Sequence, residues 1–278
     1  MKLTSFINTL FFPVLLLATP NETNYLKLKT TWDNNITYLK FMLKSPMIGE
    51  ERYNYQKGME ENYISHISVI DIKKDKKILD VSTSSYMREN LIIKFKYIDI
   101  ERSENIKFII TDNKGSQNNY NANTNKGKSQ YLTPSKATAL YDKVETINYR
   151  KQNPQIFKSK NIDEAIKALY GTVKEPIENK IKLSLKEHNY CHELIPIHIS
   201  SDVDLESFAI FNNQNKYPTI AVFSLDKVKM IDLKFNVRMF KTCTDYSIII
   251  VGKDSMGNIY ITSEKARVAC ADGCGGGG

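Results

Sequence analysis

The chain has 278 residues, a formal net charge of +8 at pH 7 and a hydrophobic fraction of 41%. These values exclude wholesale disorder, and the length is sufficient for two domains. The positive charge suggests nucleic acid, but the lysines are scattered along strand-like segments, without zinc-finger spacing, a Walker loop or an aromatic-basic stacking signature. We therefore interpret the charge as a mildly basic solvated surface and expect no nucleic-acid partner.

Residues 1–20 have the pattern of a secretory signal peptide. Lys2 precedes an almost wholly apolar run from Phe6 to Ala18, and a polar segment follows. The run is too short for a membrane span, and no other stretch approaches that length. We expect an exported, soluble protein in a compartment where disulfides persist.

The segment 21–115 alternates short strands with polar turns. Asp33-Asn34-Asn35 between two apolar runs predicts a hairpin, and Lys94 and Lys96 alternate with apolar residues that share the opposite face. This spacing of strands favours a small β-sandwich. The predicted strands cover residues 25–28, 36–43, 64–72, 78–81, 91–98 and 106–111.

A change of composition marks residues 116–131, which are rich in Asn, Ser, Gly, Lys and Gln with almost no aliphatic side chains. We interpret this segment as an interdomain linker. Two helices are expected after it. Pro134 suits a first helical turn with Thr133 as its cap, and a second helix over residues 162–170 has Asn161 as its cap and Gly171 after its end.

The segment 132–268 ends in a second β pattern. The predicted strands cover residues 181–185, 194–200, 207–211, 219–225, 230–239, 246–251 and 259–268. Seven short strands in this length indicate an immunoglobulin-like sandwich. The predicted fold is therefore mainly β, with two immunoglobulin-like β-sandwich domains, short helices before the second, and an arm over residues 269–278.

Four cysteines in an exported chain suggest pairing. Cys191 lies in the turn between the first two strands of the second sandwich, and Cys243 in the turn between the fifth and sixth. Such turns fall at the same end of an antiparallel sandwich, so we predict a Cys191–Cys243 disulfide. Two separate free thiols are the alternative. Cys270 is in phase with Ala266 and Val268, so it is expected to face the core if the last strand continues. A Cys270–Cys274 disulfide is the alternative.

The arm residue Cys274 is surrounded by glycine. Cys274 is the sixth residue after Val268, an extended reach of roughly 20 Å. No basic side chain lies within the arm, so a thiolate there is not stabilised by its own surroundings. We therefore expect a carrier that enters the pockets of other proteins, not an enzyme. Gly273, Gly275, Gly276, Gly277 and Gly278 form the flexible arm, with Cys274 as the attachment point.

The four histidines have no metal-ligand spacing and form no nucleophilic triad pattern. No metal and no cofactor is expected. At this point the chain resembles a fusion of SoxZ and SoxY, the two subunits of the thiosulfate-oxidation (Sox) sulfur carrier. The SoxY part is carried by the glycine-flanked Cys274, by Ala168-Leu169-Tyr170-Gly171, by Leu194-Ile195-Pro196-Ile197 and by Ile259-Tyr260-Ile261-Thr262-Ser263. The SoxZ part is carried by Ser45-Pro46-Met47, Ile64-Ser65-His66-Ile67, the 90–96 segment and Asp112-Asn113-Lys114-Gly115.

The resemblance implies a periplasmic scaffold for sulfur intermediates. In that family the haem enzyme SoxAX joins thiosulfate to the tail cysteine, the SoxB thiohydrolase releases sulfate, and in some systems SoxCD oxidises the sulfur that remains. For this chain it implies a covalent sulfur adduct on Cys274. The leader lacks the arginine pair of the usual twin-arginine signal, so we expect Sec export, which a covalently fused chain allows. The three additional cysteines and the extra glycines also depart from the family pattern.

Two rival hypotheses come from other classes. A ubiquitin-like sulfur carrier holds sulfur as a thiocarboxylate on its terminal glycine, which uses ATP and gives Cys274 no role. A non-catalytic extracellular β-sandwich module uses its cysteine for an intermolecular disulfide.

Overall fold

The computed structural model describes residues 25–44, 61–87, 91–124, 128–135, 144–173, 175–189, 195–225, 229–238 and 244–268. These residues are mainly β, as the sequence predicts. In the first half of the chain the strands are β1 (Tyr25–Asp33), β2 (Ile36–Lys44), β3 (Ile64–Asp71), β4 (Lys76–Thr83), β5 (Leu91–Ile98), β6 (Asn105–Asp112), β7 (Gln117–Asn123) and β8 (Gln130–Leu132).

The second half begins with short helices and continues as strands. The helices are α2 (Tyr149–Gln152), α3 (Gln155–Lys158) and α4 (Ile162–Tyr170). The strands are β9 (Ile177–Glu178), β10 (Ile181–Ser184), β11 (His188–Asn189), β12 (Ile195–Ser201), β13 (Leu205–Asn212), β14 (Thr219–Ser224), β15 (Met230–Val237), β16 (Thr244–Asp254) and β17 (Ile259–Val268).

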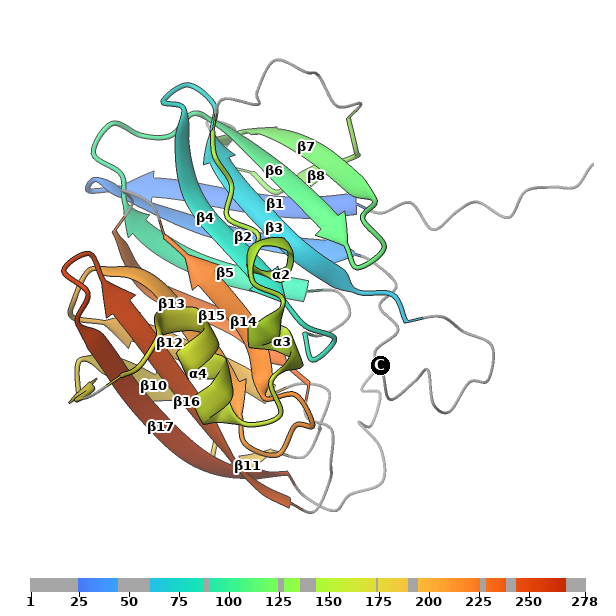
Figure 1. Cartoon of the computed structure of the whole chain (residues 1–278). Helices are drawn as coiled ribbons and strands as arrows, with labels where there is room; N and C mark the ends of the chain where they lie inside the picture. The colour runs from blue at the N-terminus through green and yellow to red at the C-terminus, as the bar shows by residue number, and fades with distance from the viewer. Residues whose placement is uncertain are drawn as a thin grey trace, which may run out of the picture.

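Within the described residues the strands form two sheets that face each other (Figure 1). The seven-stranded sheet has the order β10-β12-β15-β5-β2-β1-β8, and the ten-stranded sheet has the order β11-β17-β16-β13-β14-β4-β3-β6-β7, with β9 also paired to β17. Both sheets run through both halves, because β5 pairs with β15 and β4 pairs with β14, each antiparallel. The immunoglobulin-like sandwich architecture is confirmed, but its two halves share their sheets.

One core fills the space between the sheets. Phe41 of β2 meets Phe108 of β6 with ring centroids 5.2 Å apart, and Phe223 of β14 meets Phe235 of β15 at 5.8 Å. The buried side chains of both halves belong to the same apolar cluster. Burial of this apolar surface is the main stabilising contribution to such a fold.

Local sequence explains the strand connections. Asp33 pairs with Ile36, which leaves Asn34 and Asn35 as a two-residue turn. Both asparagines have positive φ, 48° and 62°, as a hairpin turn of this length with the right twist requires, and asparagine tolerates that region well. The predicted alternation also holds in β5, where inward residues are buried while Lys94 is exposed.

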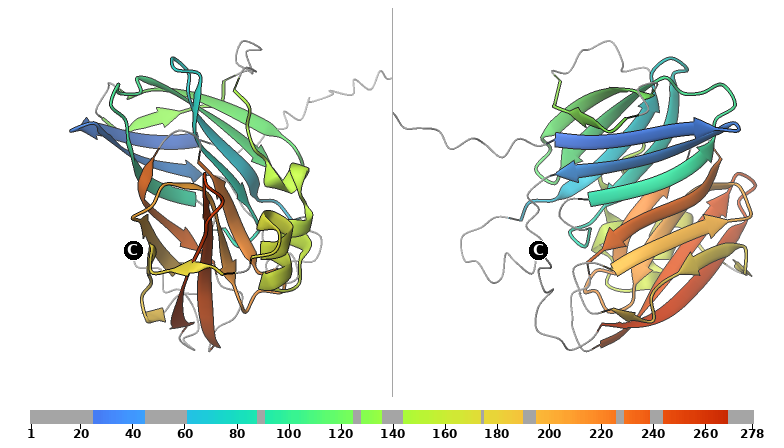
Figure 2. Two further views of the ribbon diagram at one scale, coloured as in Figure 1. Left: turned by 60° about the vertical axis from the view of Figure 1, so that its left-hand side comes forward. Right: turned by 180° about the vertical axis from the view of Figure 1, so that it is seen from behind.

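Helix α4 matches the prediction in its bounds and caps. The Asn161 side chain accepts a hydrogen bond from the Glu164 backbone N–H at 2.8 Å, and Gly171 follows the last turn with φ 77°. The helices lie on the outer face of the ten-stranded sheet, where Ile156 and Ala165 pack with Phe211 and Val222 (Figure 1). The outer face of the seven-stranded sheet has no such cover among the described residues (Figure 2, right).

The structure differs from the sequence prediction in two places. The predicted linker, residues 116–131, contains β7, which is paired along its length with β6. Tyr120 and Ala122 are buried, and the polar residues between them made the strand unrecognisable by hydrophobicity. The helix predicted at Pro134 is wrong at its start, because residues 130–132 form β8 and Ser135 bridges to Asn119.

Candidate functional site

All predicted site residues lie outside the described residues. This holds for Cys274 with Gly273, Gly275, Gly276, Gly277 and Gly278, for the proposed pair Cys191 and Cys243, and for Cys270. The predicted signal peptide, residues 1–20, also lies outside. The structure therefore describes where the arm starts, at Val268.

The origin of the arm is held firmly by the sheet. Val268 is 1% exposed and is the register partner of Thr244 on one side and of Asn189 on the other. The backbone N–H of Arg267 donates to the Glu187 carbonyl at 2.8 Å. Because β17 is flanked by strands on both sides up to this residue, the segment predicted to form the arm begins from a fixed point.

The same three strand ends carry the chain neighbours of the other cysteines. Asn189 lies two residues before Cys191, Thr244 directly follows Cys243, and Val268 lies two residues before Cys270. The register places Asn189, Val268 and Thr244 in one row across neighbouring strands, so the outer two are about 10 Å apart. The Cys191–Cys243 disulfide stays a prediction.

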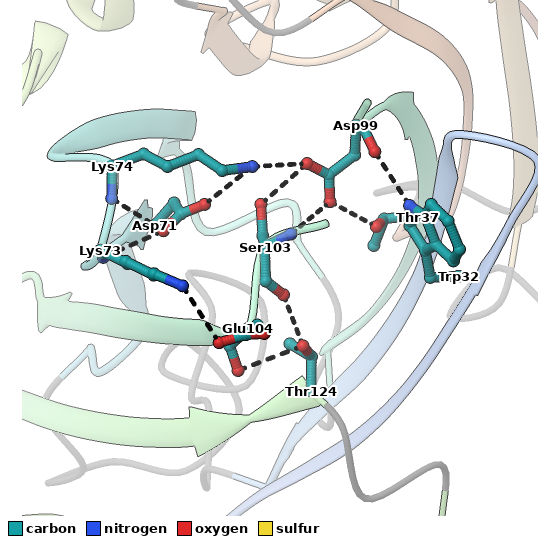
Figure 3. Close-up of polar contacts among 9 residues, drawn as sticks. All are labelled: Trp32, Thr37, Asp71, Lys73, Lys74, Asp99, Ser103, Glu104 and Thr124. Carbon is teal, nitrogen blue, oxygen red and sulfur yellow. Dashed lines mark hydrogen bonds and ion pairs between the residues drawn. The ribbon is translucent and has the colours of Figure 1, made fainter. Parts of the chain in front are cut away.

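A polar network around Asp99 joins the two sheets at one end of the sandwich (Figure 3). The Asp99 carboxylate accepts hydrogen bonds from the Thr37 hydroxyl at 2.6 Å, from the Ser103 N–H at 2.7 Å and from Lys74 Nζ at 3.0 Å. The Ser103 hydroxyl adds a fourth at 3.2 Å. Thr37 belongs to the seven-stranded sheet, while Lys74 follows β3 of the ten-stranded sheet.

This network contains the polar residues of a catalytic site, but its role is structural. Burial acts to raise the pKa of Asp99, but the hydrogen bonds from Thr37 and Ser103 and the Lys74 ammonium outweigh it and lower the pKa. A depression of about 310 Å³ lies beside Asp99 and Lys74. Four donors already fill the lone pairs of the carboxylate, so it has no free acceptor with which to serve as a general base.

A second group, His66, Ser68, Asp80 and Ser82, contains the residue types of a hydrolytic triad. His66 Nε2 lies 2.9 Å from the Ser68 hydroxyl and 3.7 Å from Asp80 Oδ1. The Ser82 hydroxyl lies 3.4 Å from the other ring nitrogen, Nδ1, so a hydroxyl and a carboxylate flank the ring as in a triad. The 3.7 Å between Nε2 and Asp80 is, however, too long for the hydrogen bond that orients a triad histidine. Burial is the largest effect on His66 and lowers its pKa, which keeps the ring neutral.

That second group is also closed to a substrate. None of its four residues is more than 3% exposed, and the segment before α2 covers them. The Ile147 N–H donates to Asp80 at 2.6 Å and the Tyr149 N–H donates to Ser82 at 2.9 Å. The group fastens the helical cover to the sheet.

No group of three or more His, Cys, Asp or Glu side chains among the described residues is arranged to hold a metal ion. No helix of the described part is both long and apolar enough to cross a bilayer.

No protein-family model matches the chain, and no curated protein matches it in sequence. Among solved structures it is similar to the sulfur carrier protein SoxY from Chlorobium limicola f thiosulfatophilum, with 22% identity and a TM-score of 0.34 over 38% of this chain and 94% of that one. It is also similar to the chicken interferon gamma receptor alpha chain, with 10% identity and a TM-score of 0.25 over 88% and 98%. These likenesses concern the β fold and carry no argument about function.

Proposed function

We propose that the protein is a non-catalytic sulfur carrier that holds thiosulfate-derived intermediates on Cys274. The observation that carries the proposal is the thiol flanked only by glycines, a short distance beyond the last strand of the sandwich. Side chains are absent next to the sulfur, so the segment fits a narrow channel that any bulkier sequence would block.

The anchored end of β17 supports this proposal. Val268 is buried and paired on both sides, and the six residues from there to Cys274 reach roughly 20 Å when extended. A fixed origin and a reach of this length deliver a covalently held group to an active site on another protein. Tethering of this kind raises the local concentration of the group at its partner.

The chemistry requires partners, because the arm has no group that activates its own thiol. Attachment joins the Cys274 thiolate to thiosulfate as a cysteine S-thiosulfonate and releases two electrons, which a haem enzyme of the SoxAX class accepts. Hydrolysis by a SoxB-type thiohydrolase then releases sulfate and two protons and leaves a persulfide on Cys274. In some pathways a SoxCD-type dehydrogenase oxidises that sulfur. We propose that this takes place in the periplasm after Sec export, with no resident cofactor on the chain.

The test is a Cys274→Ser variant as the sole copy in cells that grow on thiosulfate, with Cys270→Ser as the matched control. We expect Cys274→Ser to accumulate to the normal level but to abolish thiosulfate consumption, while Cys270→Ser keeps it. Normal consumption with Cys274→Ser would overturn the proposal. Peptide mapping separates the rivals, since a thiocarboxylate places sulfur on a terminal carboxyl and an intermolecular disulfide gives dimers without a sulfur adduct.

A further inference from the structure

Four lysines on adjacent strands stand in one straight row on the outer face of the seven-stranded sheet. They are Lys29 of β1, Lys40 of β2, Lys94 of β5 and Lys234 of β15. Each is the direct register partner of the next, so their side chains leave the sheet on the same side. All four are exposed. We call this set the lysine row.

Lys29, Lys40 and Lys94 align within the first half, and the row reaches Lys234 because the two halves share a sheet. Lys94 belongs to the first half and Lys234 to the second, and the pairing of β5 with β15 brings them together. His198 of β12 continues the line beyond Lys234. The sequence scatters these lysines among separate strands, so the expectation of an unclustered basic charge is wrong for this face.

Like charges directly opposite each other on a sheet destabilise it, and within the described residues these lysines are not paired with a carboxylate. Asp232, the nearby carboxylate on this face, is 3.3 Å from Lys96 and 3.2 Å from His198. Among the described residues, no carboxylate forms an ion pair with a member of the lysine row. Repulsion among side chains that destabilises the fold without a compensating contact is typical of a surface that binds another molecule.

The shape of the surface decides what kind of ligand it fits. Three inter-strand steps of about 4.8 Å give the row a length of roughly 14 Å, longer than a single oxyanion. Shallow depressions of about 330 and 310 Å³ lie along it and share Lys40, Lys94 and Lys234 as lining residues. The face is therefore broad and open, like the docking patch of a protein.

The aromatic side chains on this face argue against single-stranded nucleic acid, which needs open rings for base stacking. Lys27 lies over the Tyr131 ring at 4.9 Å and Lys44 over the Tyr25 ring at 5.7 Å. Arg102 lies over Trp32 at 5.8 Å. Trp32 lies at the end of β1 with the parity of its inward residues, so two rings on the face of the lysine row are covered by cations of this chain. Tyr38, which is 43% exposed, stays open beside the row, and a single open ring does not stack a succession of bases.

We propose that the lysine row is a docking surface for an acidic protein partner. Complementary charge of this kind steers two proteins together and raises the association rate, with a strong dependence on salt. The inference rests on the charge pattern of the sheet and not on the carrier proposal, so either can fail without the other.

The test compares two variants of the full chain with the same change in net charge. One changes the lysine row, as K29Q, K40Q, K94Q and K234Q together. The control changes four exposed lysines of the helical cover on the opposite face, as K151Q, K158Q, K160Q and K167Q together. Binding of fluorescein-labelled poly-L-glutamate is measured by anisotropy at low and high salt, with unlabelled oligothymidylate and inorganic sulfate as competitors.

We expect the row variant to lose affinity for poly-L-glutamate by at least about tenfold, as four exposed ion pairs would give together. The control should change it by less than about twofold, because the two faces are farther apart than the screening length. Equal losses in both variants, or no binding by the natural chain, would overturn the proposal. So would tighter binding of oligothymidylate than of poly-L-glutamate at equal charge, or displacement by sulfate at concentrations that leave ionic strength unchanged.

Discussion

The two outer faces of this sandwich are built on opposite principles. On the ten-stranded sheet, Phe211 and Val222 point outward into an apolar cluster that α3 and α4 close, and buried hydrogen bonds to Asp80 and Ser82 fasten the cover. On the seven-stranded sheet the outward positions include the four lysines of the row, with no helical cover among the described residues (Figure 2). The first face contributes stability, and the second is the one that we propose for contact with an acidic partner.

The largest effect should come from the covered face. Phe211 is fully buried beneath the helices, so Phe211→Ala removes a large apolar side chain and leaves a cavity. We expect a loss of about 3–5 kcal/mol in the free energy of unfolding, measured with urea. Tyr38→Ala on the open face, where the ring is 43% exposed, should cost less than about 1 kcal/mol. Similar losses at the two positions would contradict the contrast.

The next effect concerns the network that holds the two sheets together at Asp99. Asp99→Asn removes charge-assisted hydrogen bonds, so we expect a loss of about 1–3 kcal/mol at neutral pH. The pKa of this carboxyl is lowered by folding, so its stabilisation is present above the unfolded pKa and is lost as pH falls through the folded value. The variant should therefore show a shallower loss of stability in acid. The assignment would be refuted if the free energy of unfolding fell as steeply in acid for the variant as for the natural chain. It would also be refuted if Asp99→Asn cost no more stability than Asp33→Asn at an exposed position.

A smaller effect is expected at the cap of α4. Asn161→Ala removes the acceptor for the Glu164 N–H, which should cost about 1 kcal/mol, whereas Asn161→Gly should cost only a few tenths. The comparison is made by thermal and urea unfolding. If alanine were tolerated as well as glycine, the cap would contribute nothing to the cover.

The smallest expected effect is an increase in stability. Lys94 stands between Lys40 and Lys234, so Lys94→Gln relieves repulsion and should raise stability by a few tenths of a kcal/mol at low salt. The gain should vanish at high salt because the charges are then screened. Lys167→Gln on the covered face provides the control. A loss of stability at low salt would mean that the row is not under electrostatic strain.

Much of the local structure could be predicted from the sequence. The bounds of β5 and β17 agree with the alternation of apolar residues, and Asn161 and Gly171 mark the ends of α4. The strand β7 could not be found this way, because its outward positions are asparagines and only Tyr120 and Ala122 mark its inward face. An edge strand with so few apolar residues has the composition of a linker.

The long-range pairings were beyond the reach of sequence patterns. Nothing local to β4 or β5 indicates that each pairs with a strand of the other half, so the shared sheets were not foreseen. The lysine row follows from those pairings, which is why it was missed as well. The alternation of residues in the 91–98 segment predicts that Lys94 points outward. It does not indicate which strands lie beside this one in the sheet. The arm around Cys274, by contrast, is a prediction from the sequence alone, because it lies outside the described residues.

The carrier proposal is tested most directly by the intact mass of the protein purified from thiosulfate-exposed cells, before and after reduction. We predict added mass that corresponds to sulfur or thiosulfonate, that disappears on reduction and that maps to the peptide containing Cys274. An unmodified mass from cells that are actively consuming thiosulfate, or an adduct located elsewhere on the chain, would contradict it.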